Sequence, residues 1–374
     1  MKPSPHLMLA LSGHGYGHLA QVAPVINALW QQLPALQLTV CSNLPQAVIA
    51  GRLDRAFTSR HVELDVVIPM SSAWEVDVAA ACAAWKSFHR DLDAGLQRDV
   101  DLLGEIKPDL VFADVPYRIL SAARLARIPA VALCSLNWAS IYAAYCTTAD
   151  ERETTLRQMW DAYRAADVFL APVPAMDMPE LGNYRAIGPI ARRGVQQRTA
   201  LCEQLGLPRE TRIVMVALGG IATTLPLANW PRMEKVAWLL SGAAAVQRDD
   251  LFDFSTLPLA FIDMLASVDA VLTKPGYGTY AEAVCNGIPL LTLSRPDWPE
   301  TPYLNAWARR HGRLQEISKQ QFDSGKFAAA LHDLWQQPPA DSYSGADGIQ
   351  QAVELLLERL RPRPDPLRLI PPAG

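Results

Sequence analysis

The chain has 374 residues, of which 50% are hydrophobic and 19% are charged, and its formal net charge is -4. This length predicts about two domains, each able to bury a core of its own. The acidic balance, without any Lys/Arg run interleaved with aromatic residues, argues against nucleic acid as a partner.

Short apolar runs alternate with longer helical patterns along the first half of the chain. The runs are continuous rather than alternating, as in strands that are buried on both faces. We expect strands at residues 7–12, 37–42, 62–68, 109–114, 130–135 and 168–171. We expect helices near residues 19–32, 45–52, 75–106, 117–127 and 151–166.

A second strand-and-helix series begins at residue 212. Strands are expected at residues 212–218, 237–241, 269–273, 289–294 and 314–317, and helices near 259–267, 280–287, 302–311 and 348–360. The fold class is therefore α/β, with two doubly wound parallel-sheet, Rossmann-like domains facing a cleft.

The Pro- and Gly-rich stretch 172–193 has no helical period and separates the two series, with a hinge expected near Gly188 and Pro189. We expect an N-terminal acceptor-side domain at 1–184, a linker at 185–193 and a C-terminal nucleotide-sugar-binding domain at 194–346. Residues 347–374 are expected to form a C-terminal helix and a Pro-rich tail, and a return of this segment to the N-terminal domain is left open.

Targeting and redox signals are weak. The N-terminal apolar run LMLAL is too short for a signal sequence or a membrane span. Six cysteines lie scattered without metal-ligand spacing: Cys41, Cys82, Cys134, Cys146, Cys202 and Cys285. We expect reduced thiols in a cytoplasmic protein without a transmembrane segment. Peripheral contact with the inner membrane face and the oligomeric state are left open.

The stretch LSGHGYGHLAQ carries Gly15, Gly17, His14 and His18 in the turn between the first strand and the first helix. Ligands of doubly wound sheets lie at such turns. The spacing is not GxGxxG and no acid ends the second strand, which disfavours a dinucleotide. His18 would begin the helix, where the positive helix end favours a neutral imidazole able to act as a base. Alternatively, His18 only caps the helix and His14 only faces water.

Further polar groups are expected at the same edge of the first sheet. Asp114 ends the fourth predicted strand and is the candidate partner of His18, unless it only caps the helix after Pro116. Asn137 and Trp138 follow the fifth strand, although a buried tryptophan is more often simply part of a core.

The loop KPGYGT follows a predicted strand and precedes a helix expected to begin near Thr279. Its Gly276 and Gly278 and the free N–H groups of the helix suit a diphosphate. Glu282 is expected in the first turn, where it reaches a ribose diol or only favours the helix dipole. A second glycine turn, at Gly219 and Gly220, faces the same crevice.

The order GHGYGH, RAIGPIARR, LGG and KPGYGTYAEAVCNGIPLL followed by RPDWPETPYLNAW resembles the GT-B nucleotide-sugar glycosyltransferases. Within them it is similar to the group of the peptidoglycan N-acetylglucosaminyl transferase and the glucuronosyl- and glucosyltransferases. DVPYRILSAARLARIPAVALCSLNWASIYAAY with KPGYGTYAEAV resembles more closely the glycosyltransferase-like N-terminal part of plant L-arabinokinases. No sugar-kinase phosphate loop is found, so kinase activity is not implied.

The resemblance implies roles for the candidate residues. His18 matches the family's base, Asp114 the acid that supports it, and Glu282 the ribose ligand. The candidates on the nucleotide-sugar side are Gly219, Gly220, Phe254, Ser255, Lys274, Gly276, Tyr277, Gly278, Thr279, Glu282, Asp297 and Glu300. Those on the acceptor side are His14, Gly15, Gly17, Asn137 and Trp138. The family's Asp-Gln or Gln-Gln pair is replaced by PDWPET, which leaves the sugar and the retention of catalysis open.

The sequence therefore predicts an inverting glycosyltransferase that moves a hexosyl or N-acetylhexosaminyl group from a nucleoside diphosphate sugar, with UDP expected, to an acceptor hydroxyl. No cofactor and no metal are expected, because no Asp-x-Asp-like pair ends a strand. Two alternatives are a nucleotide-sugar 2-epimerase of the same fold and a non-catalytic nucleotide-sugar-binding module.

Overall fold

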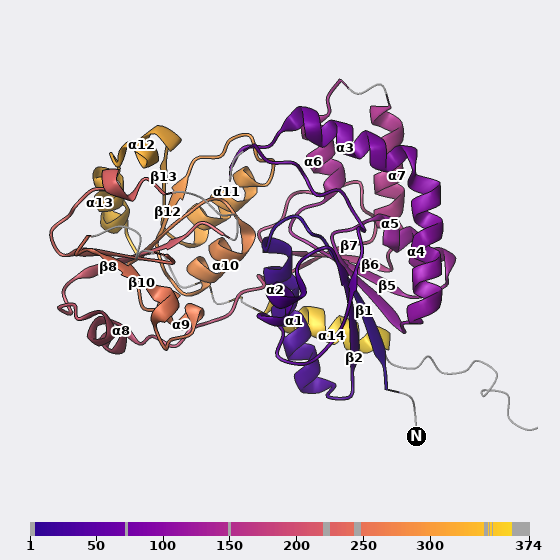
Figure 1. The fold of residues 1–374 in the computed structure, drawn as a ribbon, viewed down its shortest axis with the longest axis horizontal. Coiled ribbons are helices and arrows are strands. Elements are labelled where there is room, and N and C mark those ends of the chain that lie inside the picture. Colours follow the sequence, from indigo (N-terminus) through magenta and orange to yellow (C-terminus); the bar gives the residue numbers. More distant parts are fainter. Residues whose placement is uncertain are drawn as a thin grey trace, which may run out of the picture.

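The computed structural model describes residues 4–71, 74–148, 151–219, 225–242, 248–339, 343, 345 and 347–360. Figure 1 shows two lobes, each built on a β-sheet packed with helices. All pairings between neighbouring strands in the two sheets are parallel. The prediction of two doubly wound parallel-sheet domains is confirmed.

The first sheet has the order β3-β2-β1-β4-β5-β6-β7. Its strands are β1 (His6–Leu11), β2 (Gln37–Ser42), β3 (Thr58–His61), β4 (Leu110–Asp114), β5 (Ala130–Leu133), β6 (Val168–Pro172) and β7 (Tyr184–Ile187). The strand order reverses between β1 and β4, and a crevice forms at such a switch point beyond the carboxyl ends of the strands.

The second sheet repeats this arrangement in the order β10-β9-β8-β11-β12-β13. Its strands are β8 (Arg212–Ala217), β9 (Val236–Leu240), β10 (Leu251–Asp253), β11 (Ala270–Thr273), β12 (Leu290–Leu293) and β13 (Leu314–Ile317). The corresponding switch point lies between β8 and β11, which are followed by the two predicted glycine loops of this domain.

Helices cover the sheets. In the first half of the chain they are α1 (Gly17–Gln32), α2 (Gln46–Ala50), α3 (Val78–Arg90), α4 (Leu92–Ile106), α5 (Arg118–Leu125), α6 (Trp138–Tyr145) and α7 (Arg152–Arg164). In the second half they are α8 (Arg198–Leu205), η1 (Leu227–Asn229), η3 (Phe254–Thr256), α9 (Phe261–Leu265), α10 (Tyr277–Cys285), α11 (Thr301–His311), α12 (Lys319–Ser324), α13 (Ala328–Gln336) and α14 (Gly348–Leu360). Among the described residues, no helix combines the length and apolarity needed to cross a membrane.

Two element predictions are wrong in the first domain. The third strand is the mostly exposed β3, whereas residues 62–68 form a non-helical segment outside the strands, with Leu64, Val66 and Ile68 buried in the core. The expected helix 75–106 is divided at Asp91 into α3 and α4. A buried apolar run therefore indicates burial here, but it does not by itself indicate strand pairing.

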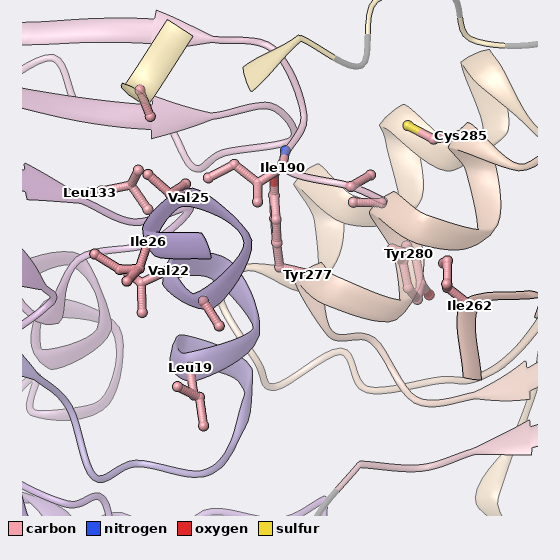
Figure 2. Close-up of a cluster of buried hydrophobic side chains, with 14 of the residues drawn as sticks. Leu19, Val22, Val25, Ile26, Leu133, Ile190, Ile262, Tyr277, Tyr280 and Cys285 are labelled. Atoms are coloured by element: carbon pink, nitrogen blue, oxygen red, sulfur yellow. The ribbon is translucent and has the colours of Figure 1, made fainter. Parts of the chain in front are cut away.

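The two domains share a hydrophobic cluster between α1 and α10. Figure 2 shows α1, which carries Leu19 and Val22, next to the helix that carries Tyr277 and Tyr280, and Ile190 of the linker lies beside Tyr277. The hydroxyl of Tyr277 donates to the carbonyl of Val173 (3.2 Å) and accepts from the N–H of Ile190 (2.8 Å). The linker is thus fixed to both domains by packing and by hydrogen bonds.

The C-terminal helix α14 packs against α1 and β7 of the first domain, and Figure 1 shows it in yellow beside α1. Its first residue, Gly348, lies directly on the linker: a Cβ atom there would be 1.9 Å from the carbonyl oxygen of Gly188. The contact requires glycine because no side chain fits between the two backbones. The predicted tail at 361–374 lies outside the described residues.

The expectation of reduced thiols throughout is wrong for one pair of cysteines. Cys82 of α3 and Cys146, which follows α6, form a disulfide although they are 64 residues apart. Cys41, Cys134, Cys202 and Cys285 are free and buried. Pairing across this distance depends on the packing of α3 against α6, which cysteine spacing does not reveal.

The close contact between Gly348 and Gly188 predicts how a substitution changes stability. Gly348→Ala should lower the free energy of unfolding by about 1–3 kcal/mol, because the new methyl group must push the linker away from α14. Urea unfolding followed by circular dichroism measures this change.

Gly104→Ala is the matched control, because Gly104 is exposed in α4 and a Cβ there meets nothing within 4 Å. It should be neutral or stabilise the protein by about 0.5–1 kcal/mol through helix propensity. Equal stability of the two variants would contradict the close contact at Gly188.

Candidate active site

The first glycine turn positions the two histidines. Gly15 has a φ of 75°, in the left-handed region that glycine adopts readily, and Gly17 is the first residue of α1. The N–H of His14 donates to Oγ of Ser12 (3.2 Å). The turn thereby brings His18, the second residue of α1, to the carboxyl edge of the first sheet.

His18 is paired with Asp114. Their Nδ1 and Oδ1 atoms are 2.9 Å apart, and the two residues are 5% and 0% exposed. Asp114 ends β4, directly beside the end of β1 in the sheet. The residue that precedes α5 is Tyr117, so Asp114 does not cap that helix. A buried carboxylate on Nδ1 orients the imidazole and leaves Nε2 as the atom that faces a reactant.

The electrostatic prediction for His18 has the wrong direction. Burial lowers the pKa of His18, but the charge and hydrogen bond of Asp114, together with the charges of Asp65 and Glu300, raise it by more, so the net shift is upward. The partial charge of a helix end is outweighed by a full carboxylate charge at hydrogen-bond distance. His18 is therefore a stronger base than an isolated imidazole and holds its proton to higher pH.

Aromatic rings surround the histidine pair. The His14 ring lies between Trp138, with centroids 5.5 Å apart, and Trp298 of the second domain, with centroids 6.1 Å apart. Trp138 also meets His18 edge-on at 5.5 Å, and its Nε1 donates to Asp65 (2.7 Å). Burial and then the neighbouring His18 lower the pKa of His14 to about 3, so its ring stays neutral.

A hydrogen bond crosses from one domain to the other at Glu300. Its Oε1 accepts from Oγ of Ser135 (2.6 Å), which follows β5, and its Oε2 accepts from Nε1 of Trp298 (3.2 Å). Ser135 is held in turn by Gln21 of α1. Burial raises the pKa of Glu300. Glu300 is thus a buried group of the domain interface rather than an open carboxylate.

The predicted diphosphate loop lies opposite the first glycine turn. Gly276 precedes α10, and a Cβ at Gly278 would be only 3.4 Å from that of Ala20 in α1. Lys274 contacts the second glycine turn, since its Cε would be 3.6 Å from a Cβ at Gly219, where φ is 83°. Gly220 lies outside the described residues.

Glu282 lies in the second turn of α10, because the helix begins at Tyr277 instead of near Thr279. Its Oε1 accepts from Nε of Arg192 in the linker (2.9 Å), an ion pair that the sequence did not indicate. This contact fixes the carboxylate on the linker side of the helix. Its role toward ribose stays a prediction.

The remaining candidates are more scattered. Asp253 accepts from the N–H and the hydroxyl of Ser255 and so fixes the turn that contains Phe254. The backbone carbonyl of Asp297 accepts from the hydroxyl of Tyr145 (2.9 Å). Asn137 caps α6 by accepting from the N–H of Ser140 (2.7 Å), which gives it a structural role.

Three side chains of types that bind metal ions lie close together around His18. The ligand atoms of His18, Asp114 and Cys134 lie within 4.8 Å of one another, and all three residues are buried. Such a set is also capable of holding a metal ion, which the sequence did not predict because the residues come from three separate elements.

Sequence reasoning missed Asp65, Ser135, Trp298 and Arg295. Asp65 was assigned to a buried strand, so no role was considered for its side chain. Trp298 and Arg295 stand in the unusual segment RPDWPET, and this departure from the family pattern was the signal that could have identified them.

A cavity of about 900 Å³ lies in the first domain between the segment 62–67 and helices α3 and α4. Asp65 lines this cavity and is also bonded to Trp138, so it links the cavity to the histidine pair. Asn137 and Trp138, two of the candidates on the acceptor side, do not line it.

Solved structures with the same architecture are glycosyltransferases. The chain is similar to the glycotransferase of kitacinnamycin, with a TM-score of 0.63 and 16% identity, over 96% of this chain and all of the other. The TM-score is 0.62 with UGT89C1 of Arabidopsis thaliana, at 17% identity over 96% of this chain and all of the other. It is 0.61 with the calicheamicin glycosyltransferase CalG4, at 15% identity over 96% and 95%. The fold is therefore that of the GT-B glycosyltransferases.

Among curated proteins, the chain is similar to the L-arabinokinase of Arabidopsis thaliana. The two are 26% identical over an alignment 378 residues long, which covers 95% of this chain and 34% of the relative. The chain thus spans about a third of that protein's length. No protein-family model matches the chain.

The pair of His18 and Asp114 predicts an observable titration. By NMR of labelled histidine, His18 should titrate above 6.5, its ordinary pKa, and His14 near 3. In Asp114→Asn the pKa of His18 should fall, because burial still lowers it while the charge and hydrogen bond of Asp114 no longer raise it.

Asp161→Asn is the control, since it removes a carboxylate paired with Arg164 on the exposed surface of α7. It should leave the His18 titration unchanged. An unchanged His18 midpoint in Asp114→Asn would show that the carboxylate does not control the imidazole.

Proposed function

We propose that the protein is an inverting glycosyltransferase that moves a sugar from a nucleoside diphosphate, UDP being the expected one, to an acceptor hydroxyl. The observation that carries this proposal is the buried pair of His18 and Asp114 at the start of α1, which packs against the start of α10 at Ala20 and Gly278. One domain thus offers a base and the other an anion-binding helix end. The fold comparisons support the same reaction class.

His18 acts as the general base in this proposal. Nδ1 is held by Asp114, so Nε2 takes the proton of the acceptor hydroxyl as its oxygen attacks the anomeric carbon. The bond from that carbon to the diphosphate breaks, and the nucleoside diphosphate leaves. A single displacement inverts the anomeric configuration.

The leaving diphosphate is stabilised by the second domain. Lys274 and the backbone N–H groups at the start of α10 would bind its oxygens, as helix N-termini and loop amides bind phosphates. Glu282, fixed by Arg192, would bind the ribose diol. The neighbour from Phytolacca americana was solved with UDP-2fluoro-glucose, which makes UDP the first nucleotide to test.

The role of His18 as the base can be tested with a variant and a matched control. His18→Ala should reduce acceptor-dependent transfer by about 10²–10⁴-fold while leaving the affinity for the nucleotide unchanged, because the base contacts only the acceptor proton. Initial rates with UDP-sugars and a panel of hydroxyl acceptors, together with calorimetry with UDP, measure both effects.

His332→Ala is the control, since His332 is exposed on α13 in the other domain. Full transfer by His18→Ala would refute the assignment of the base. Release of free sugar without an acceptor would favour an epimerase, and donor binding without any turnover would favour a binding module.

The ribose ligand is tested separately. Glu282→Ala should weaken UDP and UDP-sugars alike by about 10- to 100-fold, the value of hydrogen bonds to a charged group. Calorimetry with UDP and with its 2′-deoxy analogue measures this. The two ligands should bind the variant with similar affinity, because the contact that the analogue lacks is already removed. Glu203→Ala, an exposed change on α8, is the control. If Glu282→Ala binds UDP as tightly as the parent protein, Glu282 does not bind the ribose and its role is limited to the ion pair with Arg192.

Metal independence is tested with a chelator. Transfer should persist after dialysis against EDTA, because Lys274 and the amides at the start of α10 would supply the stabilisation that a metal ion otherwise gives. Loss of transfer that is restored by a divalent ion would refute this part, and the cluster of His18, Asp114 and Cys134 would then be the first site to examine.

A further inference from the structure

Arg295 is a buried cation that follows β12 at the carboxyl edge of the second sheet. It is 7% exposed, and its guanidinium carbon lies 4.5 Å from the centroid of the Trp298 ring. Within the described residues, its Nε and one terminal nitrogen have no hydrogen-bond partner. The ion pairs of the described part of the chain do not include it either.

The nearest acids do not satisfy this guanidinium. Both oxygens of Glu300 accept hydrogen bonds from Ser135 and Trp298, and Asp297 is exposed. Burial lowers the pKa of Arg295, and the neighbouring Tyr145, Asp297 and Glu300 raise it by less. A buried cation normally has a hydrogen-bonded anion, so an acceptor is missing here.

A second cation lies close by. Lys274 follows β11, the strand that pairs with β12. Burial and then the charge of Arg295 lower the pKa of Lys274 to about 8, which places the two charges near enough to repel each other. An anionic ligand that approaches both would relieve this repulsion.

The location of Arg295 identifies the part of the ligand that it meets. Its guanidinium lies on Trp298, whose ring faces His14, and the His14 ring is 6.4 Å from that of His18. Arg295 therefore lies on the path from Lys274 to the base. In the function proposed above, the diphosphate lies at Lys274 and the sugar lies between it and His18.

A cavity of about 150 Å³ borders Arg295 and is also lined by Trp74 and Asp297. It lies where the first domain meets the loop after β12, on the same side of the second sheet. There is therefore space beside Arg295 for a small polar group of a ligand.

We propose that the donor sugar is a uronic acid and that its carboxylate is bound by Arg295. The planar fork of a guanidinium matches a carboxylate in two parallel hydrogen bonds, and neither a neutral hexose nor an N-acetylhexosamine offers such a group. Stacking on Trp298 holds the fork in place. This inference rests on the proposed transferase function and specifies its substrate class.

Calorimetry with pairs of donors that differ only at C6 tests the inference. The pairs are UDP-glucuronate with UDP-glucose, and UDP-galacturonate with UDP-galactose, so that both C4 configurations are covered. The parent protein should bind one of the uronates about 10- to 100-fold more tightly than its neutral partner, the usual gain from a charge-assisted pair. Arg295→Gln should remove this preference and leave UDP and the neutral donors unchanged.

Two further variants complete the test. Arg295→Lys keeps the charge without the fork and should retain only part of the preference. Arg310→Gln, which removes an exposed arginine from α11, should behave like the parent protein.

The remaining outcomes would overturn the inference. If the parent protein binds uronates and neutral donors equally, the inference is wrong, and no variant is needed to show it. If Arg295→Gln weakens UDP itself as much as the uronates, the guanidinium binds the diphosphate instead. If no UDP compound binds, the proposed function fails together with the inference, whereas tight binding of neutral donors alone leaves that function standing.

Discussion

The packing of α1 against α10 is the contact on which the rest of the structure depends. Each helix begins at a glycine turn at the carboxyl edge of its own sheet, and the two helices meet at Gly278 and Ala20. Because Gly278 has no side chain, the starts of the two helices come close together. Tyr277 then joins this contact to the linker through Val173 and Ile190. The two glycine turns are therefore held close to each other where the domains meet.

This contact explains the electrostatics of the crevice. His18, Asp114, Glu300 and Arg295 are all buried, and low local polarity strengthens the interactions among them. Oδ1 of Asp114 is paired with His18, and both oxygens of Glu300 accept hydrogen bonds, from Ser135 and Trp298. Arg295 is the cation in this group that the described residues leave without a hydrogen-bonded acid. The same burial that raises the pKa of the acids therefore leaves a site for an anion.

The sequence predicted those parts that depend on local pattern. Continuous apolar runs indicated β1, β4 and β11, and the residues that follow them were identified as site residues for that reason. The exposed edge strand β7 has no such run, and it was missed. Contacts between distant residues were also missed, because spacing does not reveal them: Trp138 with Asp65, 73 positions apart, and Arg192 with Glu282, 90 positions apart. Sequence pattern thus locates the edge of each sheet, while packing decides which side chains meet there.

The segment RPDWPET is an example in which sequence pattern and packing must be considered together. In the resembling family an Asp-Gln or Gln-Gln pair stands at this place, whereas here the acid of the segment, Glu300, is buried and accepts hydrogen bonds from Ser135 and Trp298. A different group of this segment is then the better candidate for binding the donor sugar. Arg295 is that group in our proposal, since it is buried, stacked on Trp298 and in need of an acceptor. The segment RPDWPET, which left the sugar open in the sequence, thus contains the residue that would select the sugar in our proposal.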